Sequence, residues 1–138
     1  MHPIIAAIDG CLSVWPKQDG GDAKEVERLN ELGVEQMVRG ETGAALEYFL
    51  KALEATNNNT GLRAACFINL GDWLRRVEGN LDLALLTFFI AEREPLSWAQ
   101  TIRLWAMRAM VYSFASESGE YDPIGIIKNI KLLSHAYE

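Results

Sequence analysis

Apolar residues recur along the chain with the period of an α-helix, and short polar breaks divide the pattern. Helices are predicted for residues 23–39, 42–56, 60–78, 80–94, 97–116 and 122–136. The breaks hold residues typical of helix ends: Gly40, Asn57, Asn58, Asn59, Gly79, Pro95 and Gly119. The densest run of β-forming residues, LLTFFI at 85–90, lies inside a helical pattern and predicts a buried helix at the centre of the core. The chain is therefore predicted to be all-α.

Helix starts are marked by side chains that accept hydrogen bonds from free backbone N–H groups. The predicted caps are Asp22, Thr42, Thr60, Asn80, Ser97 and Asp122. Two of them have the spacing of a capping box, Asp22 with Glu25 and Ser97 with Gln100.

Residues 1–15 are predicted to form a separate N-terminal helix, joined to the rest by a linker at 16–21 (PKQDGG). Its large apolar residues follow one helical stripe: Ile4, Ile5, Ile8, Leu12 and Trp15. We expect this stripe to pack on the first helix pair as a cap. In the alternative interpretation it mediates dimerisation, or it occupies a groove of its own or a neighbouring chain.

Two of the predicted helix pairs repeat an order of small and large residues, with an offset of about 38 positions. The first pair contains Leu32, Gly33, Ala45, Phe49 and Ala52. The second contains Leu70, Gly71, Ala84, Phe88 and Ala91, with one extra residue before Gly79. A weaker third copy contains Trp105, Ala109 and Tyr112. We expect the small residues to let the helices approach closely where they cross, and the large ones to fill the holes around them.

This order resembles the tetratricopeptide repeat (TPR), whose unit reads W-x₂-L-G-x₂-Y followed by A-x₃-F and a proline. Leu29 and Phe67 stand at the Trp position, Gln36 replaces the Tyr, and Pro95 matches the proline. The resemblance covers residues 23–137. It implies an α-solenoid of three TPR-like antiparallel helix pairs, at about 22–56, 60–94 and 97–137 of a domain at 22–138, with an extra N-terminal helix.

The resemblance also implies a concave groove, lined by the first helix of each pair, that holds a peptide or helix of a partner protein. The implied partner-binding residues are Glu27, Asn30, Glu31, Val34, Met37, Asn69, Asp72, Arg75, Arg76, Arg103, Met107 and Met110. Asn69 matches one position of the clamp by which some members bind a terminal carboxylate, but Asn30 and Val34 replace its Lys and Asn. In the alternative interpretation, Asn69 binds a neighbouring helix, the methionines pack between pairs and the charges form a solvated face.

Composition narrows the function further. The chain has 138 residues, 49% of them apolar, and 13 bases against 19 acids give a net charge of −6. An acidic chain is unsuited to nucleic acid, and no apolar run is long enough to cross a membrane. Cys11 and Cys66 are expected to be small hydrophobes in a reducing, cytoplasmic setting.

The sequence contains no recognisable catalytic motif. His2 and His135 lie near the two ends, far from metal-ligand spacing, and the chain has neither a phosphate-binding glycine loop nor a nucleophile elbow. We expect no enzyme activity, no metal and no cofactor, and favour a protein–protein interaction module. Three alternatives remain. The first is a small secretion-type chaperone for an aggregation-prone partner, and the second is a self-assembling structural subunit, a homodimer through the N-terminal helix. The third is an accessory or regulatory domain of an enzyme.

Overall fold

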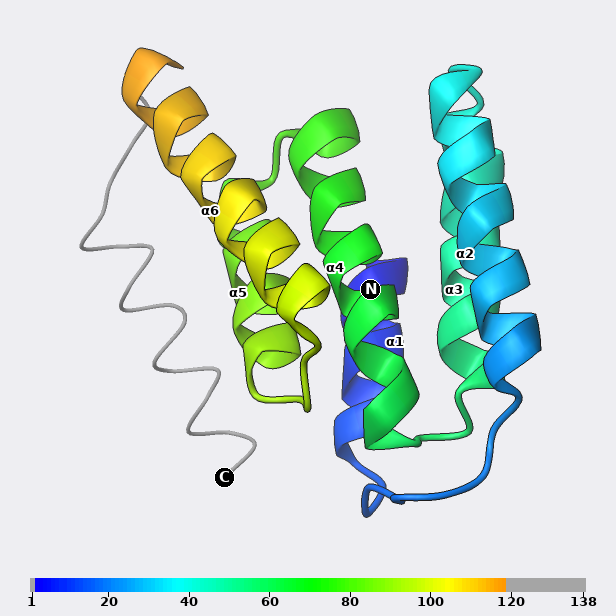
Figure 1. The fold of residues 1–138 in the computed structure, drawn as a ribbon. Coiled ribbons are helices and arrows are strands. Elements are labelled where there is room, and N and C mark those ends of the chain that lie inside the picture. Colours follow the sequence, from blue (N-terminus) through cyan, green and yellow to red (C-terminus); the bar gives the residue numbers. More distant parts are fainter. Residues whose placement is uncertain (1, 119–138) are drawn as a thin grey trace.

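The structure is a computed structural model that describes residues 2–118, and over these residues the protein is all-α, as predicted (Figure 1). The helices are α1 (Pro3–Leu12), α2 (Ala23–Val38), α3 (Thr42–Ala55), α4 (Thr60–Trp73), α5 (Leu81–Glu92) and α6 (Trp98–Ser118). A π-helical turn, η1 (Leu74–Glu78), extends α4. The helix predicted at 122–136 lies outside the described residues.

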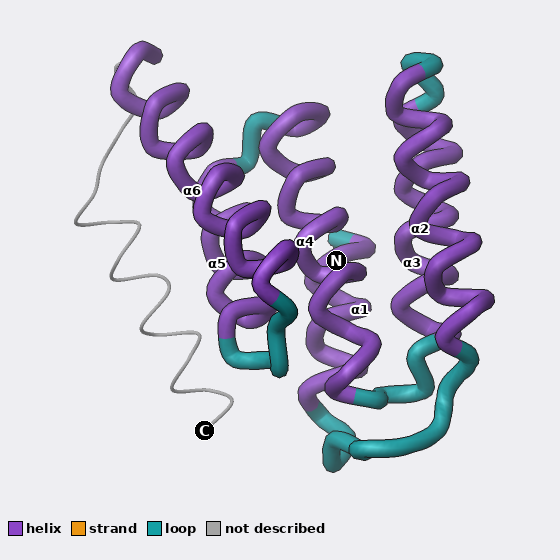
Figure 2. Tube along the Cα trace, viewed as in Figure 1, coloured by secondary structure: helices purple, strands orange, loops and turns teal. Residues whose placement is uncertain are grey.

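The helices pack as sequential neighbours (Figure 2). Helix α2 packs on α3, and α4 with η1 packs on α5. The first helices of the pairs also meet in turn, α2 with α4 and α4 with α6. The core lies mainly between α4 and α5, where nearly every residue from Cys66 to Leu74 and from Leu83 to Ala91 is buried. The predicted central helix thus shares that role with α4.

Each of the first two helix pairs is closed by the same contact between a glycine and a phenylalanine ring. A Cβ atom on Gly33 would lie 2.3 Å from a ring carbon of Phe49, and one on Gly71 would lie 2.4 Å from a ring carbon of Phe88. This confirms that Gly33 and Gly71 let the helices of these two pairs approach closely. The extra residue of the second pair is accommodated by η1, since a π-helical turn contains more residues than an α-helical one.

Most helix ends agree with the sequence, and two caps differ by one residue. Asp22 and Asn80 accept hydrogen bonds from the N–H groups of Glu25 and Leu83 at 3.1 and 3.2 Å. Both bonds of the Ser97–Gln100 capping box are present, at 2.9 and 3.1 Å.

The assignment of Thr42 and Thr60 as caps is wrong, because each is the first residue of its helix and the residue before it takes the cap position. Asn59 accepts a hydrogen bond from the N–H of Gly61 at 2.8 Å, whereas Glu41 makes no side-chain cap bond. The Thr60 hydroxyl instead donates to the carbonyl of Lys17 at 3.4 Å.

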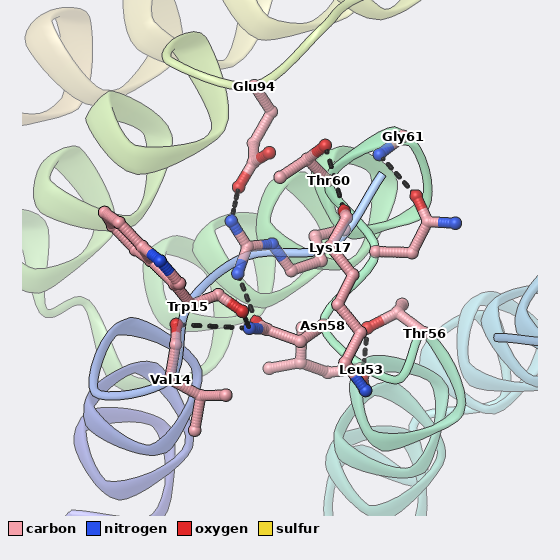
Figure 3. Close-up of polar contacts among 11 residues, drawn as sticks. Val14, Trp15, Lys17, Leu53, Thr56, Asn58, Thr60, Gly61 and Glu94 are labelled. Atoms are coloured by element: carbon pink, nitrogen blue, oxygen red, sulfur yellow. Dashed lines mark hydrogen bonds and ion pairs between the residues drawn. The ribbon is translucent and has the colours of Figure 1, made fainter. Parts of the chain in front are cut away.

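The N-terminal helix follows its predicted stripe only in part. Ile4 and Ile8 are fully buried, but α1 ends at Leu12, and Trp15 beyond it is 90% exposed. The chain leaves the helix here because the Asn58 side-chain amide donates to the carbonyls of Val14 and Trp15, at 3.2 and 3.0 Å (Figure 3). Helix α1 also contacts more than the first pair. It packs on α3, and Nε2 of His2 lies 2.8 Å from the Glu78 carboxylate in η1.

No helix among the described residues is both long and apolar enough to cross a membrane.

Candidate functional site: the groove between α2, α4 and α6

A hollow of about 720 Å³ lies between α2, α4 and the start of α6. Figure 1 shows these three helices in the order α6, α4, α2 across the molecule. Six of the predicted partner-binding residues line the hollow: Glu27, Asn30, Glu31, Val34, Asn69 and Arg103. Val26, Leu62 and Ala65 give it an apolar floor. We call this hollow the groove.

Helical periodicity explains why α2 contributes four of these residues. Positions 27, 30, 31 and 34 follow the i, i+3, i+4, i+7 spacing of one helix face. The opposite face carries Leu29 and Gly33, which are buried in the pair with α3. Glu27, Glu31 and Val34 are exposed to solvent at the groove surface.

At the other side of the groove, Asn69 and Arg103 join α4 to α6. The Arg103 guanidinium donates to Oδ1 of Asn69 at 2.6 Å. Burial lowers the pKa of Arg103, an effect that the nearby charge of Asp72 opposes. Asn69 is buried and engaged by a neighbouring helix, as the alternative interpretation of the sequence described.

Among the residues lining the groove, Asn30 has a buried polar atom that lacks a hydrogen-bond partner within the described part of the chain. Asn30 is only 8% exposed, and its Nδ2 donates a hydrogen bond to the Cys66 sulfur at 3.6 Å. Its Oδ1 is buried and has no hydrogen-bond partner among the described residues. A buried acceptor without a donor costs about 1–3 kcal/mol, so the Oδ1 of Asn30 lowers the stability of the folded chain.

Cys66, whose sulfur accepts the hydrogen bond from Asn30, is expected to be almost inert towards thiol reagents in the native protein. Burial raises the pKa of its thiol to about 12, against a smaller opposing effect of the Asn30 amide. Only the thiolate reacts, and at pH 8 less than about one thousandth of the Cys66 side chains are in that form. A Cys11→Ser variant should therefore react with Ellman's reagent at the rate of protein opening, and much faster in denaturant. Rapid reaction of the native variant would contradict the buried environment.

The other six predicted residues lie outside the groove. Asp72, Arg75 and Arg76 form a cluster of their own, in which the Asp72 carboxylate lies 2.6 Å from Arg75 and 3.7 Å from Arg76. Met107 lies beside it, with its sulfur 4.0 Å from Arg75. Met37 and Met107 pack at the edge of the core, and Met110 is exposed on α6. The two arginines are thus engaged within the chain.

A second hollow, of about 560 Å³, lies on another face between α1 with its following loop, α4 and α5, and sequence reasoning did not find it. An ion pair lies at its base, where the Arg63 guanidinium is 2.5 Å from the Glu94 carboxylate and both side chains are 6% exposed. Arg63 also donates to Oδ1 of Asn58. Figure 3 shows Glu94, Asn58 and Trp15 around this site.

The sequence did contain a signal for this pair. Arg63 precedes Phe67, Leu70 and Leu74 at spacings of 4, 3 and 4, so it falls on the buried stripe of its helix. A charge at a core position requires a partner. Burial raises the pKa of Glu94, and the charge of Arg63 opposes that rise.

Among the described residues, no three His, Cys, Asp or Glu side chains are grouped closely enough to hold a metal ion. Comparisons of the chain with protein-family models, curated proteins and solved structures gave no match. No family is identified by these comparisons, and the function is argued from the groove itself.

Proposed function

We propose that the protein is a non-catalytic interaction module, built of TPR-like helix pairs, that binds a peptide or a helix of a partner protein in the groove. The observation that carries the proposal is Asn30, a residue lining the groove whose Oδ1 is buried and has no partner within the described residues. Buried polar groups of this kind are rare and call for an explanation. A donor from a bound partner would supply one once the Asn30 side chain turns its Oδ1 towards the groove.

Shape and surface chemistry support the same function. The groove is of the size that holds a few side chains. Val34 is exposed beside Leu62 and Ala65, so an apolar side chain of a partner would be removed from water there. The contacts Gly33–Phe49 and Gly71–Phe88 support the TPR-like character of the first two pairs.

The alternative of a subunit that self-assembles through α1 has less support. Ile4 and Ile8, the main apolar residues of that helix, are buried against their own chain. They are therefore already covered in a single molecule.

Filling the groove should abolish peptide binding and leave the fold intact. Peptides would first be selected on the wild-type protein from a random twelve-residue display library. Ala65 lies half-buried in the groove, and an Ala65→Trp variant would occupy the space without changing the charge. We expect fluorescence anisotropy to show loss of binding, because the indole excludes the peptide.

The matched control is Ala44→Trp in α3, since Ala44 is equally half-buried and lines none of the hollows described above. Its affinity for the peptides should equal that of the wild type. Melting temperatures of both variants would show that the fold is retained. Peptides that bind Ala65→Trp as tightly as wild type would refute the groove as the binding site.

A further inference from the structure

The acidic residues of α2 divide into two sets according to whether they face the groove. Away from the groove, Glu25 is paired with Arg28 at 2.5 Å and Glu35 with Arg39 at 3.2 Å. On the groove face, Glu27 and Glu31 form no ion pair within the described part of the chain. The helix thus neutralises the carboxylates that point elsewhere and leaves two of them unpaired at the groove surface.

Arg103, the one base among the residues lining the groove, is not placed to neutralise them. It is half-buried at the opposite side, where its guanidinium is held 2.6 Å from Asn69 and lies near the charge of Asp72. Glu27 and Glu31 are one helical turn apart, so their Cβ atoms lie about 5–6 Å from each other and both carboxylates belong to the same face.

We infer that the groove selects a basic partner segment, whose Lys or Arg side chains pair with Glu27 and Glu31 while one of its hydrogen-bond donors meets Asn30. The inference rests on the proposed function and names the chemical class of the partner. Alternate residues of a strand, or residues four apart on a helix, place two bases at the required spacing. Rotation of the Asn30 side chain would turn its unpartnered Oδ1 towards the groove.

The test is the charge of peptides selected from an unbiased random twelve-residue display library. Peptides enriched on the wild-type protein should be rich in Lys and Arg, and raising the salt concentration should weaken their binding. The variant Glu27→Lys/Glu31→Lys should bind them less tightly, by about two- to fivefold per carboxylate, as for other exposed ion pairs. The control Glu47→Lys/Glu54→Lys makes the same change in net charge on exposed positions of α3 and should bind as wild type does.

The Asn30→Leu variant tests the second contact. Leucine removes the unpartnered acceptor at nearly constant volume, so the melting temperature should stay the same or rise while affinity for the selected peptides falls. A structural role alone would lower the melting temperature instead.

Failure of this inference differs from failure of the proposed function. Enriched peptides that are neutral or acidic, yet are excluded by Ala65→Trp, would overturn the basic partner and leave the groove as a binding site. Enriched peptides unaffected by Ala65→Trp, by Asn30→Leu and by charge reversal at Glu27 and Glu31 would overturn both.

Discussion

Replacing Arg63 by methionine is expected to lower the free energy of unfolding by about 3–5 kcal/mol, the cost of leaving one member of a buried ion pair without its partner. The Arg63 and Glu94 side chains are each 6% exposed and lie 2.5 Å apart. Methionine fills much the same space, so the loss would come mainly from the Glu94 charge, which would remain buried without a cation. Urea denaturation followed by far-UV circular dichroism gives the measurement.

The double variant Arg63→Met/Glu94→Leu separates the missing partner from the missing contacts. It removes both charges, and apolar replacement of a buried pair is often neutral or stabilising. We therefore expect it to recover most of the stability that Arg63→Met loses. A double variant as unstable as the single one would show that the arginine acts mainly through its bond to Asn58 and the loop that Asn58 holds.

The helices themselves could be predicted because their signals are local. Gly40 and Gly79 mark the ends of the first helices of two pairs, and both adopt positive φ, at 81° and 63°. The N-cap residue of a helix is harder to assign from sequence where two neighbouring residues both have side chains that can cap. Asn59 and Thr60 both have cap side chains, and the chain selects Asn59 because the Thr60 N–H and hydroxyl are engaged by the Lys17 carbonyl.

Contacts between distant segments were not predictable in the same way. The partner of Arg63 is 31 residues away, just past the end of α5, and Asn58, which binds the carbonyl of the exposed Trp15, is 43 residues from it. Trp105 illustrates a third case. It aligns with the buried residues Leu29 and Phe67 but is 57% exposed, and the second helix predicted for its pair lies outside the described residues.

The sequence pattern indicates which side chains share a face where helical periodicity alone decides it. Glu27, Asn30, Glu31 and Val34 follow from the α-helical spacing of α2. At the far end of α4, η1 departs from α-helical geometry after Trp73, and the residues predicted there, Asp72 in α4 included, do not line the groove. Arg75 and Arg76 there are paired with Asp72 rather than presented in the groove.

Truncating Phe88 to alanine is expected to lower the free energy of unfolding by about 3–5 kcal/mol, since a fully buried ring leaves a cavity that the helices only partly close. Phe49→Ala in the first pair should cost a similar amount, because that ring is equally buried against a glycine. Denaturant titration of the two variants gives both values.

The facing glycine shows whether the contact is specific. In the wild-type protein, Gly71→Ala would place a Cβ 2.4 Å from the Phe88 ring, an overpacking that costs about 1–3 kcal/mol. In the Phe88→Ala background the space is free, and the same substitution should stabilise by up to about 1 kcal/mol through helix propensity. Gly10→Ala in α1 is the control, because a Cβ there meets no atom within 4 Å and should stabilise in either background.

The same cycle on Gly33 and Phe49 tests whether the two helix pairs are equivalent. Their Cβ-to-ring distances, 2.3 and 2.4 Å, are nearly equal although the second pair contains η1. If packing repeats with the sequence, the coupling energies of the two cycles should agree within about 0.5 kcal/mol, the usual limit of additivity. Strong coupling in one pair and none in the other would mean that the shared residue order is not matched by shared energetics, and the TPR-like interpretation would lose its main physical support.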